Sequence, residues 1–290
     1  MTFKEKLFAY YQLIRLDKPI GILLLLWPTL WALWLAVDGW PDLMILAIFV
    51  LGTVLMRSAG CAINDFADRH IDPHVARTRQ RPLATGLVQP KEALWVAAGL
   101  SLCAFLLILP LNWLTIGLSV CALLLAASYP FTKRFFAMPQ AYLGLAFSIG
   151  MPMAFAAQTN AVPPIVWLLM LANLCWVIAY DTQYAMADRE DDLKIGIKTS
   201  AITLGRFDVA GIVLCHVAFV SILVFAGGLL QRGILYYAAL LVVLGLIIHQ
   251  YHLVREREPA RCFQAFLHNN WIGATVFIGI LLDTLSGIGR

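Results

Sequence analysis

Nine long apolar runs constrain the fold of this chain more than any other feature of its sequence. A helix needs about 20 apolar residues to cross roughly 30 Å of hydrocarbon. Only helices and closed barrels pair all their backbone polar groups in lipid, and these runs are too long and continuous for barrel strands. The sequence therefore predicts an all-α, polytopic membrane protein with nine transmembrane helices. They are expected at residues 20–37, 43–63, 93–111, 114–129, 139–157, 163–180, 209–229, 233–252 and 271–288.

The overall composition excludes a soluble two-domain protein of this length. Of the 290 residues, 61% are apolar and only 13% are charged, against roughly a quarter charged in soluble domains. The net charge of +4 is too small to predict nucleic-acid binding. The first 19 residues carry four basic residues and no A-x-A cleavage site, so we expect the first apolar run to be a permanent span rather than a signal peptide.

The positions of the basic residues predict the orientation in the membrane. Nine spans place the N-terminus and four loops on one face, and these segments hold 18 of the 21 Lys and Arg residues. The positive-inside rule makes that face cytoplasmic. The four predicted loops are 64–92, 130–138, 181–208 and 253–270.

Two acidic segments, 64–72 and 181–192, follow spans on the predicted cytoplasmic face and hold 8 of the 17 acidic residues. Helical spacing would place one stripe on each segment: Asn64, Asp68 and Asp72 on the first, and Asp181, Asp188 and Asp192 on the second. Like charges at such spacing repel and need a counter-charge. Mg²⁺ usually binds one or two carboxylates together with substrate phosphates. The segments therefore predict a magnesium–diphosphate site, with ordinary solvated loop acids as the alternative.

Basic residues surround the acidic segments, and guanidinium and ammonium groups neutralise phosphate oxygens well. The positive-inside bias alone would also explain most of them. The segment Tyr129–Arg134 is better placed, because a short loop at the membrane surface reaches only its immediate surroundings. The basic residues considered are Arg77, Arg79, Arg81, Lys133, Arg134, Lys194 and Lys198.

Asn64-x-x-x-Asp68-x-x-x-Asp72, followed by Asp188-x-x-x-Asp192, resembles the motifs of the UbiA-type intramembrane aromatic prenyltransferase superfamily. Five further segments are similar to the bacterial 4-hydroxybenzoate polyprenyltransferases within it: 17–21, 27–33, 77–83, 180–185 and 194–198. The likeness runs from about residue 10 to 280. It implies nine helices around a central cavity and one prenyltransferase domain over 1–290, with cytoplasmic motif loops 64–92 and 181–208.

The resemblance implies Mg²⁺-dependent transfer of a polyprenyl group from its diphosphate to 4-hydroxybenzoate, ortho to the hydroxyl, in ubiquinone biosynthesis at a bacterial inner membrane. The partners would be membrane lipid and these two substrates, without nucleic acid. The implied ligands of Mg²⁺ and diphosphate are Asn64, Asp68, Asp72, Asp188 and Asp192. Further diphosphate contacts would be Tyr129, Arg81, Lys133 and Lys198. Arg134 or Arg69 would hold the benzoate carboxylate, and Asp188 or Asp191 would accept a proton.

Three alternatives remain open at this stage. The acceptor could be a naphthoate, haem or a chlorin, since a few pocket residues decide it. A secondary transporter would use carboxylates near the membrane midplane on broken helices, whereas these acids lie at span ends. Membrane alcohol phosphotransferases also use paired aspartates, but their D-G-x-x-A-R segment is absent from this sequence.

Overall fold

The computed structural model describes residues 2–37, 39–132 and 134–287, and these contain twelve α-helices, two short 3-10 helices and no strand. Nine segments of these ranges are long and apolar enough to cross a membrane, which confirms the predicted number of spans. They comprise α2 (Ile20–Val37), α3 (Leu43–Asp68), α4 (Pro90–Ile108), α5 (Trp113–Thr132), α6 (Pro139–Ser148) with α7 (Gly150–Thr159), α8 (Pro164–Ile195), α9 (Ser200–Leu204) with α10 (Asp208–Leu229), α11 (Ile234–Val254) and α12 (Pro259–Ser286). The chain is a multi-pass membrane protein.

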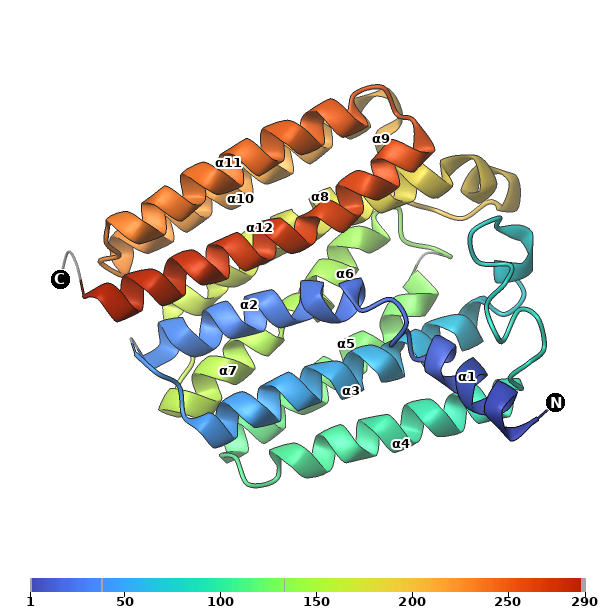
Figure 1. The fold of residues 1–290 in the computed structure, drawn as a ribbon, viewed down its shortest axis with the longest axis horizontal. Helices are drawn as coiled ribbons and strands as arrows, with labels where there is room; N and C mark the ends of the chain where they lie inside the picture. Colours follow the sequence, from blue (N-terminus) through green and yellow to red (C-terminus); the bar gives the residue numbers. More distant parts are fainter. Residues whose placement is uncertain (1, 38, 133, 288–290) are drawn as a thin grey trace.

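The spans lie side by side, and the first described residues and the end of α12 lie at opposite ends of the bundle (Figure 1). The first described residues, the segment between α3 and α4, and α9 share one end. An aromatic core joins α2, α8 and α10: the rings of Trp31 and Trp176 are 5.4 Å apart, and those of Trp176 and Phe219 are 5.7 Å apart. The two acidic segments therefore reach the same end of one packed bundle.

The predicted helical stripe over residues 64–72 is wrong at its third member. Helix α3 ends at Asp68, and Asp72 begins a separate 3-10 helix, η1 (Asp72–His74). Pro73 explains the break, because proline has no N–H and its ring clashes with the carbonyl of a preceding helical turn. The second stripe is confirmed, since Asp181, Asp188 and Asp192 all lie on α8, which continues to Ile195.

Several predicted boundaries also need correction. Helix α12 begins at Pro259, twelve positions before the predicted span, so most of the expected loop 253–270 is helical. Asn269 lies in this part, and as a polar residue it lowers the hydropathy from which the span was predicted. Its buried side chain accepts a hydrogen bond from Trp176 (2.9 Å) and donates one to Gln183 (2.8 Å). Similarly, half of the loop predicted at 181–208 belongs to α8. The span at 139–157 is divided at Ile149, because Pro152 cannot donate a backbone hydrogen bond.

Asp283, an acid near the end of the last span, is buried and has a structural role. Its carboxylate accepts the backbone N–H of Gly233 at 3.0 Å and that of Tyr236 at 3.4 Å. These groups belong to the start of α11, where backbone N–H groups have no partner within the helix. Asp283 thus caps a neighbouring helix, which explains an acid at this depth.

A short helix, α1 (Phe3–Leu13), precedes the first span and was not predicted. Its Ala9 and Leu13 are buried, whereas Phe3, Leu7 and Phe8 are exposed. The helix lies across the ends of α3 and α4 (Figure 1) and is held by Glu92 of α4, which accepts from Lys6 (2.6 Å) and Tyr10 (2.9 Å). The exposed apolar face suits the membrane interface. The residues that follow α1 lead to the candidate active site, which is described below.

Candidate active site

One cavity of about 660 Å³ opens at the end of the bundle that carries the acidic segments. Residues of α1 to α8 and of α12 line it, together with the segment between α3 and α4. All five predicted metal and diphosphate ligands line this cavity: Asn64, Asp68, Asp72, Asp188 and Asp192. The fold thus brings together two motifs that are more than a hundred residues apart in the sequence.

The donor set fits a metal ion shared with a phosphate group better than a metal site made by protein alone. Within the described ranges, no three His, Cys, Asp or Glu side chains are grouped closely enough to hold an ion. Mg²⁺ commonly takes one or two carboxylates and completes its coordination with substrate phosphates and water. Such an ion requires oxygen ligands, and carboxylate and amide oxygens lie on two sides of this one cavity.

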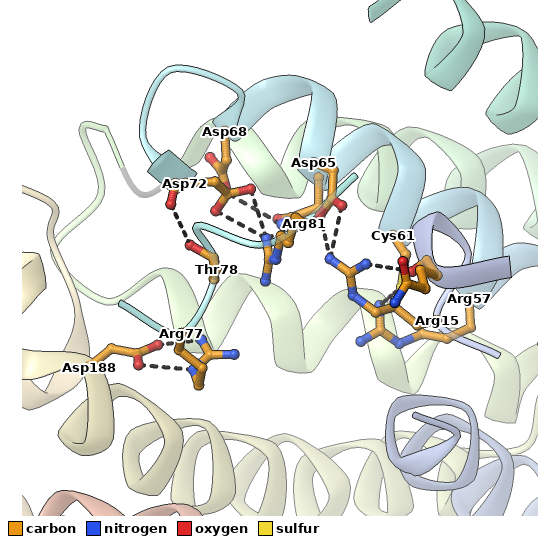
Figure 2. Close-up of polar contacts among 12 residues, drawn as sticks. Arg15, Arg57, Cys61, Asp65, Asp68, Asp72, Arg77, Thr78, Arg81 and Asp188 are labelled. Atoms are coloured by element: carbon orange, nitrogen blue, oxygen red, sulfur yellow. Dashed lines mark hydrogen bonds and ion pairs between the residues drawn. The ribbon is translucent and has the colours of Figure 1, made fainter. Parts of the chain in front are cut away.

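Arg81 joins an acid of α3, Asp65, to the acid that begins η1, Asp72 (Figure 2). Its Nη1 donates to Asp72 Oδ2 at 2.9 Å and to Asp65 Oδ1 at 3.1 Å. Asp65 is 1% exposed and also accepts two hydrogen bonds from Arg15, at 2.7 and 2.9 Å. Asp65 therefore anchors two arginines at the rim of the cavity, and α1 positions one of them.

Burial and neighbouring charges alter the acidity of this cluster. Burial raises the pKa of Asp72, and the Asp65 and Asp68 carboxylates raise it further, while Arg81 opposes them. Burial lowers the pKa of Arg81, but Asp65 and Asp72 more than offset this, so its pKa is raised overall. Arg81 stays protonated at any physiological pH, between these two carboxylates at the cavity wall.

The segment between α3 and α4 is attached to α8 by two contacts with acids, and Figure 2 shows the one between Arg77 and Asp188. Arg77 forms a bidentate ion pair with Asp188, with Nε 2.9 Å from Oδ1. The Arg77 guanidinium also lies over the Tyr184 ring, 4.2 Å from its centre. The backbone N–H of Ala76 donates to Asp191 at 2.9 Å. Asp191 thus serves this attachment and lies outside the cavity lining, unlike Asp188.

A buried ion cluster fixes the rotation of the end of α8 that carries the second acidic motif. Asp208 is 0% exposed and forms ion pairs with Arg189 of α8 and with Arg257, whose Nε is 2.9 Å from Oδ1. Arg189 also donates to the carbonyl of Ala201 at 2.7 Å. Because Arg189 lies between Asp188 and Asp192 in the helix, holding it in place turns those two acids toward the cavity.

The other predicted site residues are divided between the cavity and its surroundings. Tyr129 and Lys198 line the cavity, and Lys133 lies outside the described residues. Arg134 and Arg69 are absent from the lining: Arg134 donates to the carbonyl of Ala67 (2.7 Å), and Arg69 donates to that of Phe66 (2.8 Å). Neither predicted carboxylate-binding arginine is thus placed at the cavity wall.

Arg57 lines the cavity within a membrane span and was not among the predicted site residues. Its Nη1 donates to Cys61 Sγ at 3.1 Å, and its buried Nε finds no hydrogen-bond partner among the described residues. The side chain lies against Gly21, where an added Cβ would be 2.5 Å from Nη2. An ionisable residue inside a span is by default a functional candidate. A charged residue within an apolar run is therefore the sequence signal that could have identified Arg57.

Replacing Asp65 should destabilise the protein more than replacing a surface acid. Asp65→Ala removes the buried counter-charge of Arg15 and leaves Arg81 with Asp72 alone, at a cost of about 3 kcal/mol. Thermal unfolding in detergent measures the effect. Asp42→Ala is the matched control, because Asp42 caps the opposite end of α3 through the N–H of Met44 (2.8 Å), a loss of about 1 kcal/mol. Equal losses of stability would contradict the anchoring role.

Comparison with known proteins agrees with this geometry. The chain matches the UbiA prenyltransferase family over residues 25–272. It is 78% identical over 285 residues to the 4-hydroxybenzoate octaprenyltransferase of Nitrosomonas europaea, and the match covers 98% of both chains. It is 63% identical to the protein of that name from an Azoarcus species, over 99% of this chain and all of that one.

Solved structures share the fold. The apo structure of a UbiA homolog from Aeropyrum pernix has a TM-score of 0.79 at 26% identity, with 91% of this chain and 97% of that chain covered. A UbiA homolog from Archaeoglobus fulgidus, bound to GPP and Mg²⁺, has a TM-score of 0.73 at 16% identity, with 94% and 99% covered. The family match and the near-full-length relatives establish that this chain belongs to the UbiA prenyltransferase family.

Proposed function

We propose that the protein transfers a polyprenyl group from polyprenyl diphosphate to 4-hydroxybenzoate, at the ring carbon ortho to the hydroxyl, as a step of ubiquinone biosynthesis. One observation carries this proposal: both acidic motifs line a single cavity together with arginines, at one end of a membrane bundle. The relatives named 4-hydroxybenzoate octaprenyltransferase support the choice of acceptor, because they match nearly the whole chain at up to 78% identity.

The proposed location is a bacterial inner membrane, with the N-terminus and the cavity mouth on the cytoplasmic face. The distribution of Lys and Arg supports this orientation. It also suits the substrates, because a polyprenyl chain dissolves in lipid whereas 4-hydroxybenzoate is small, charged and water-soluble. The whole chain, residues 1–290, would act as one prenyltransferase domain.

The diphosphate of the donor binds between the two motifs. Asn64, Asp68 and Asp72 from one motif, and Asp188 and Asp192 from the other, would hold Mg²⁺ together with the diphosphate. The chemistry that a bound Mg²⁺ supplies is neutralisation of charge on the leaving diphosphate. Arg81, Tyr129 and Lys198 contact the remaining oxygens, and Arg77 joins them, since it already lies against Asp188 at the cavity wall. Lys133, which the resemblance adds to this set, lies outside the described residues.

The carboxylate of 4-hydroxybenzoate binds Arg57. A guanidinium inside a membrane span with an unpaired Nε needs an anionic partner, and a benzoate carboxylate matches its planar fork. The apolar wall around it accommodates the ring. Arg134 and Arg69, which the family resemblance favours, lie outside the cavity lining.

The reaction replaces a carbon–oxygen bond with a carbon–carbon bond. The bond between the first prenyl carbon and its diphosphate oxygen breaks, the ortho carbon of the ring attacks the allylic cation, and the ring loses a proton. Positively charged side chains stabilise the departing diphosphate, and apolar walls keep water from capturing the cation. Asp188, at the cavity wall, is the better placed of the two predicted proton acceptors.

A detergent assay tests the proposed function. Purified protein is given a polyprenyl diphosphate, Mg²⁺ and one member of an acceptor panel: 4-hydroxybenzoate, a dihydroxynaphthoate, haem or a chlorin. We expect prenylated product only with 4-hydroxybenzoate, its loss on addition of EDTA and its return with excess Mg²⁺. A transporter would show no turnover without a gradient. Product with another acceptor alone, or EDTA-insensitive turnover, would refute the proposal.

A further inference from the structure

The hydroxyl of Tyr180 is buried in the bundle and has no hydrogen-bond partner in the part of the chain that the structure describes. Its side chain is 1% exposed and lines the cavity from α8, within a membrane span. Burying a polar group without a partner destabilises the folded protein, because burial removes water and supplies nothing in its place. Phenylalanine would fill the same space without this cost. The hydroxyl is therefore a candidate contact for a ligand in the cavity.

The ring of Tyr180 is held in place by two other aromatic rings. Trp176 packs against it edge to face with ring centres 5.3 Å apart, and Phe266 of α12 makes a similar contact with ring centres 6.1 Å apart. Aromatic pairs prefer such defined arrangements. Because the hydroxyl lies in the plane of the ring, fixing the ring also fixes the point from which the hydroxyl can donate.

Arg57 of α3 lies at the same depth in the bundle as Tyr180. Arg57 is eleven positions before Asp68, the last residue of α3, and Tyr180 is twelve positions before Asp192 of α8. At a rise of about 1.5 Å per residue, both lie roughly 17 Å below the acidic motifs. The two groups interact electrostatically, and both Arg57 Nε and Tyr180 Oη are buried donors without a described partner. Two helices thus bring unused donors to the same level of one cavity.

We infer that Tyr180 is a second binding residue for the carboxylate of the acceptor: its hydroxyl donates a hydrogen bond to one carboxylate oxygen, while Arg57 binds the other. This deepens the proposed prenyl transfer and rests on it. A carboxylate accepts several hydrogen bonds through its two oxygens, and hydrogen bonds to a charged acceptor are stronger than those between neutral groups. The pair therefore selects an aromatic acid over a neutral phenol.

Binding of the carboxylate at this depth also orients the aromatic ring. The ring then points from Arg57 and Tyr180 toward the acidic motifs, and its hydroxyl end is the part nearest to the diphosphate. The distance of roughly 17 Å between the two levels accommodates the ring, the first prenyl carbon and the diphosphate. This arrangement explains attack by a carbon next to the hydroxyl rather than by one next to the carboxylate.

Replacing Tyr180 with phenylalanine tests the inference in the prenyl-transfer assay. We expect the KM for 4-hydroxybenzoate to rise at least about tenfold, as for the loss of one hydrogen bond to a charged group, and the KM for the prenyl donor to stay unchanged. The double variant with Arg57→Met should have the KM of Arg57→Met alone, because groups that hold one ligand together are not additive. Effects that multiply, or a KM for 4-hydroxybenzoate that does not rise, would overturn the inference.

Benzoate distinguishes the two ends of the acceptor, because it keeps the carboxylate and lacks the hydroxyl. We expect it to inhibit the wild-type protein in competition with 4-hydroxybenzoate, and Tyr180→Phe to raise its inhibition constant by the same factor as the KM. An unchanged inhibition constant would overturn the inference and assign Tyr180 to the phenol end. Absence of any prenyl transfer to 4-hydroxybenzoate by the wild type would instead refute the proposed function.

Tyr236→Phe is the matched control. Tyr236 is also buried, at 2% exposure, but it lies on α11 outside the cavity lining, and its hydroxyl donates to the carbonyl of Leu223 at 2.8 Å. We expect this variant to have a lower melting temperature, because that carbonyl loses its partner, and unchanged KM values. Tyr180→Phe should keep or raise the melting temperature. A loss of stability as large as that of Tyr236→Phe would show a structural partner for the Tyr180 hydroxyl and contradict its role in binding.

Discussion

Replacing Asp68 or Asp192 with alanine is expected to reduce the turnover of prenyl transfer by about 10³-fold. Each carboxylate lines the cavity from a different helix, and each is buried, at 2% and 8% exposure. Removing one group that stabilises the charge of a transition state commonly costs 10²–10³-fold, and here the metal–diphosphate group would lose one of its two supports. Steady-state assays in detergent with saturating substrates measure the change.

The control for this experiment is Glu190→Ala. Glu190 lies on α8 between Asp188 and Asp192, but it is exposed and absent from the cavity lining. We expect near-normal turnover for this variant, and melting temperatures close to that of the wild type for all three proteins. Near-normal turnover of Asp68→Ala or Asp192→Ala would remove the metal–diphosphate site from the proposal.

Replacing Arg57 with methionine is expected to raise the KM for 4-hydroxybenzoate by about 10²-fold. Hydrogen bonds between charged groups contribute about 1.5–3 kcal/mol, which corresponds to factors of roughly ten to a hundred in affinity. The KM for the prenyl diphosphate should change little, because Arg57 is eleven positions from Asp68 along α3. Arg57→Lys keeps the charge without the planar fork, and we expect it to recover part of the affinity.

The same measurement on Arg134→Ala distinguishes the structure-based assignment from the one that the family resemblance implies. Arg134 donates to the carbonyl of Ala67, so its loss should affect the end of α3 and both substrates alike. A selective rise of the KM for 4-hydroxybenzoate in Arg134→Ala, with none in Arg57→Met, would return the carboxylate to Arg134.

The number of spans was predictable because lipid imposes both a length and a composition on each helix. Boundaries failed where tertiary contacts satisfy polar groups. The start of α12 was missed because Asn269 reads as a loop residue, yet Trp176 and Gln183 satisfy its side chain inside the bundle. The error at Asp72 has a different origin, because the sequence alone could have prevented it. Pro73 was visible in the sequence and should have ended the predicted helical stripe before Asp72.

The acidic motifs of the candidate site were predictable, but the arginine partners of these acids were not. Arg15 binds Asp65 across fifty positions, and Arg77 binds Asp188 across 111. Such pairs depend on how helices are packed, and local spacing contains no information about them. Arg57 is different, because a lone arginine within an apolar run is visible in the sequence itself.

The ion pairs of the segment between α3 and α4 bear on what happens between successive turnovers. Asp188 neutralises Arg77, and Asp65 and Asp72 neutralise Arg81. The protein's own acids therefore hold in place cations that would otherwise repel one another. Each incoming donor meets a preorganised receptor, and its affinity is not reduced by the entropy of ordering that loop.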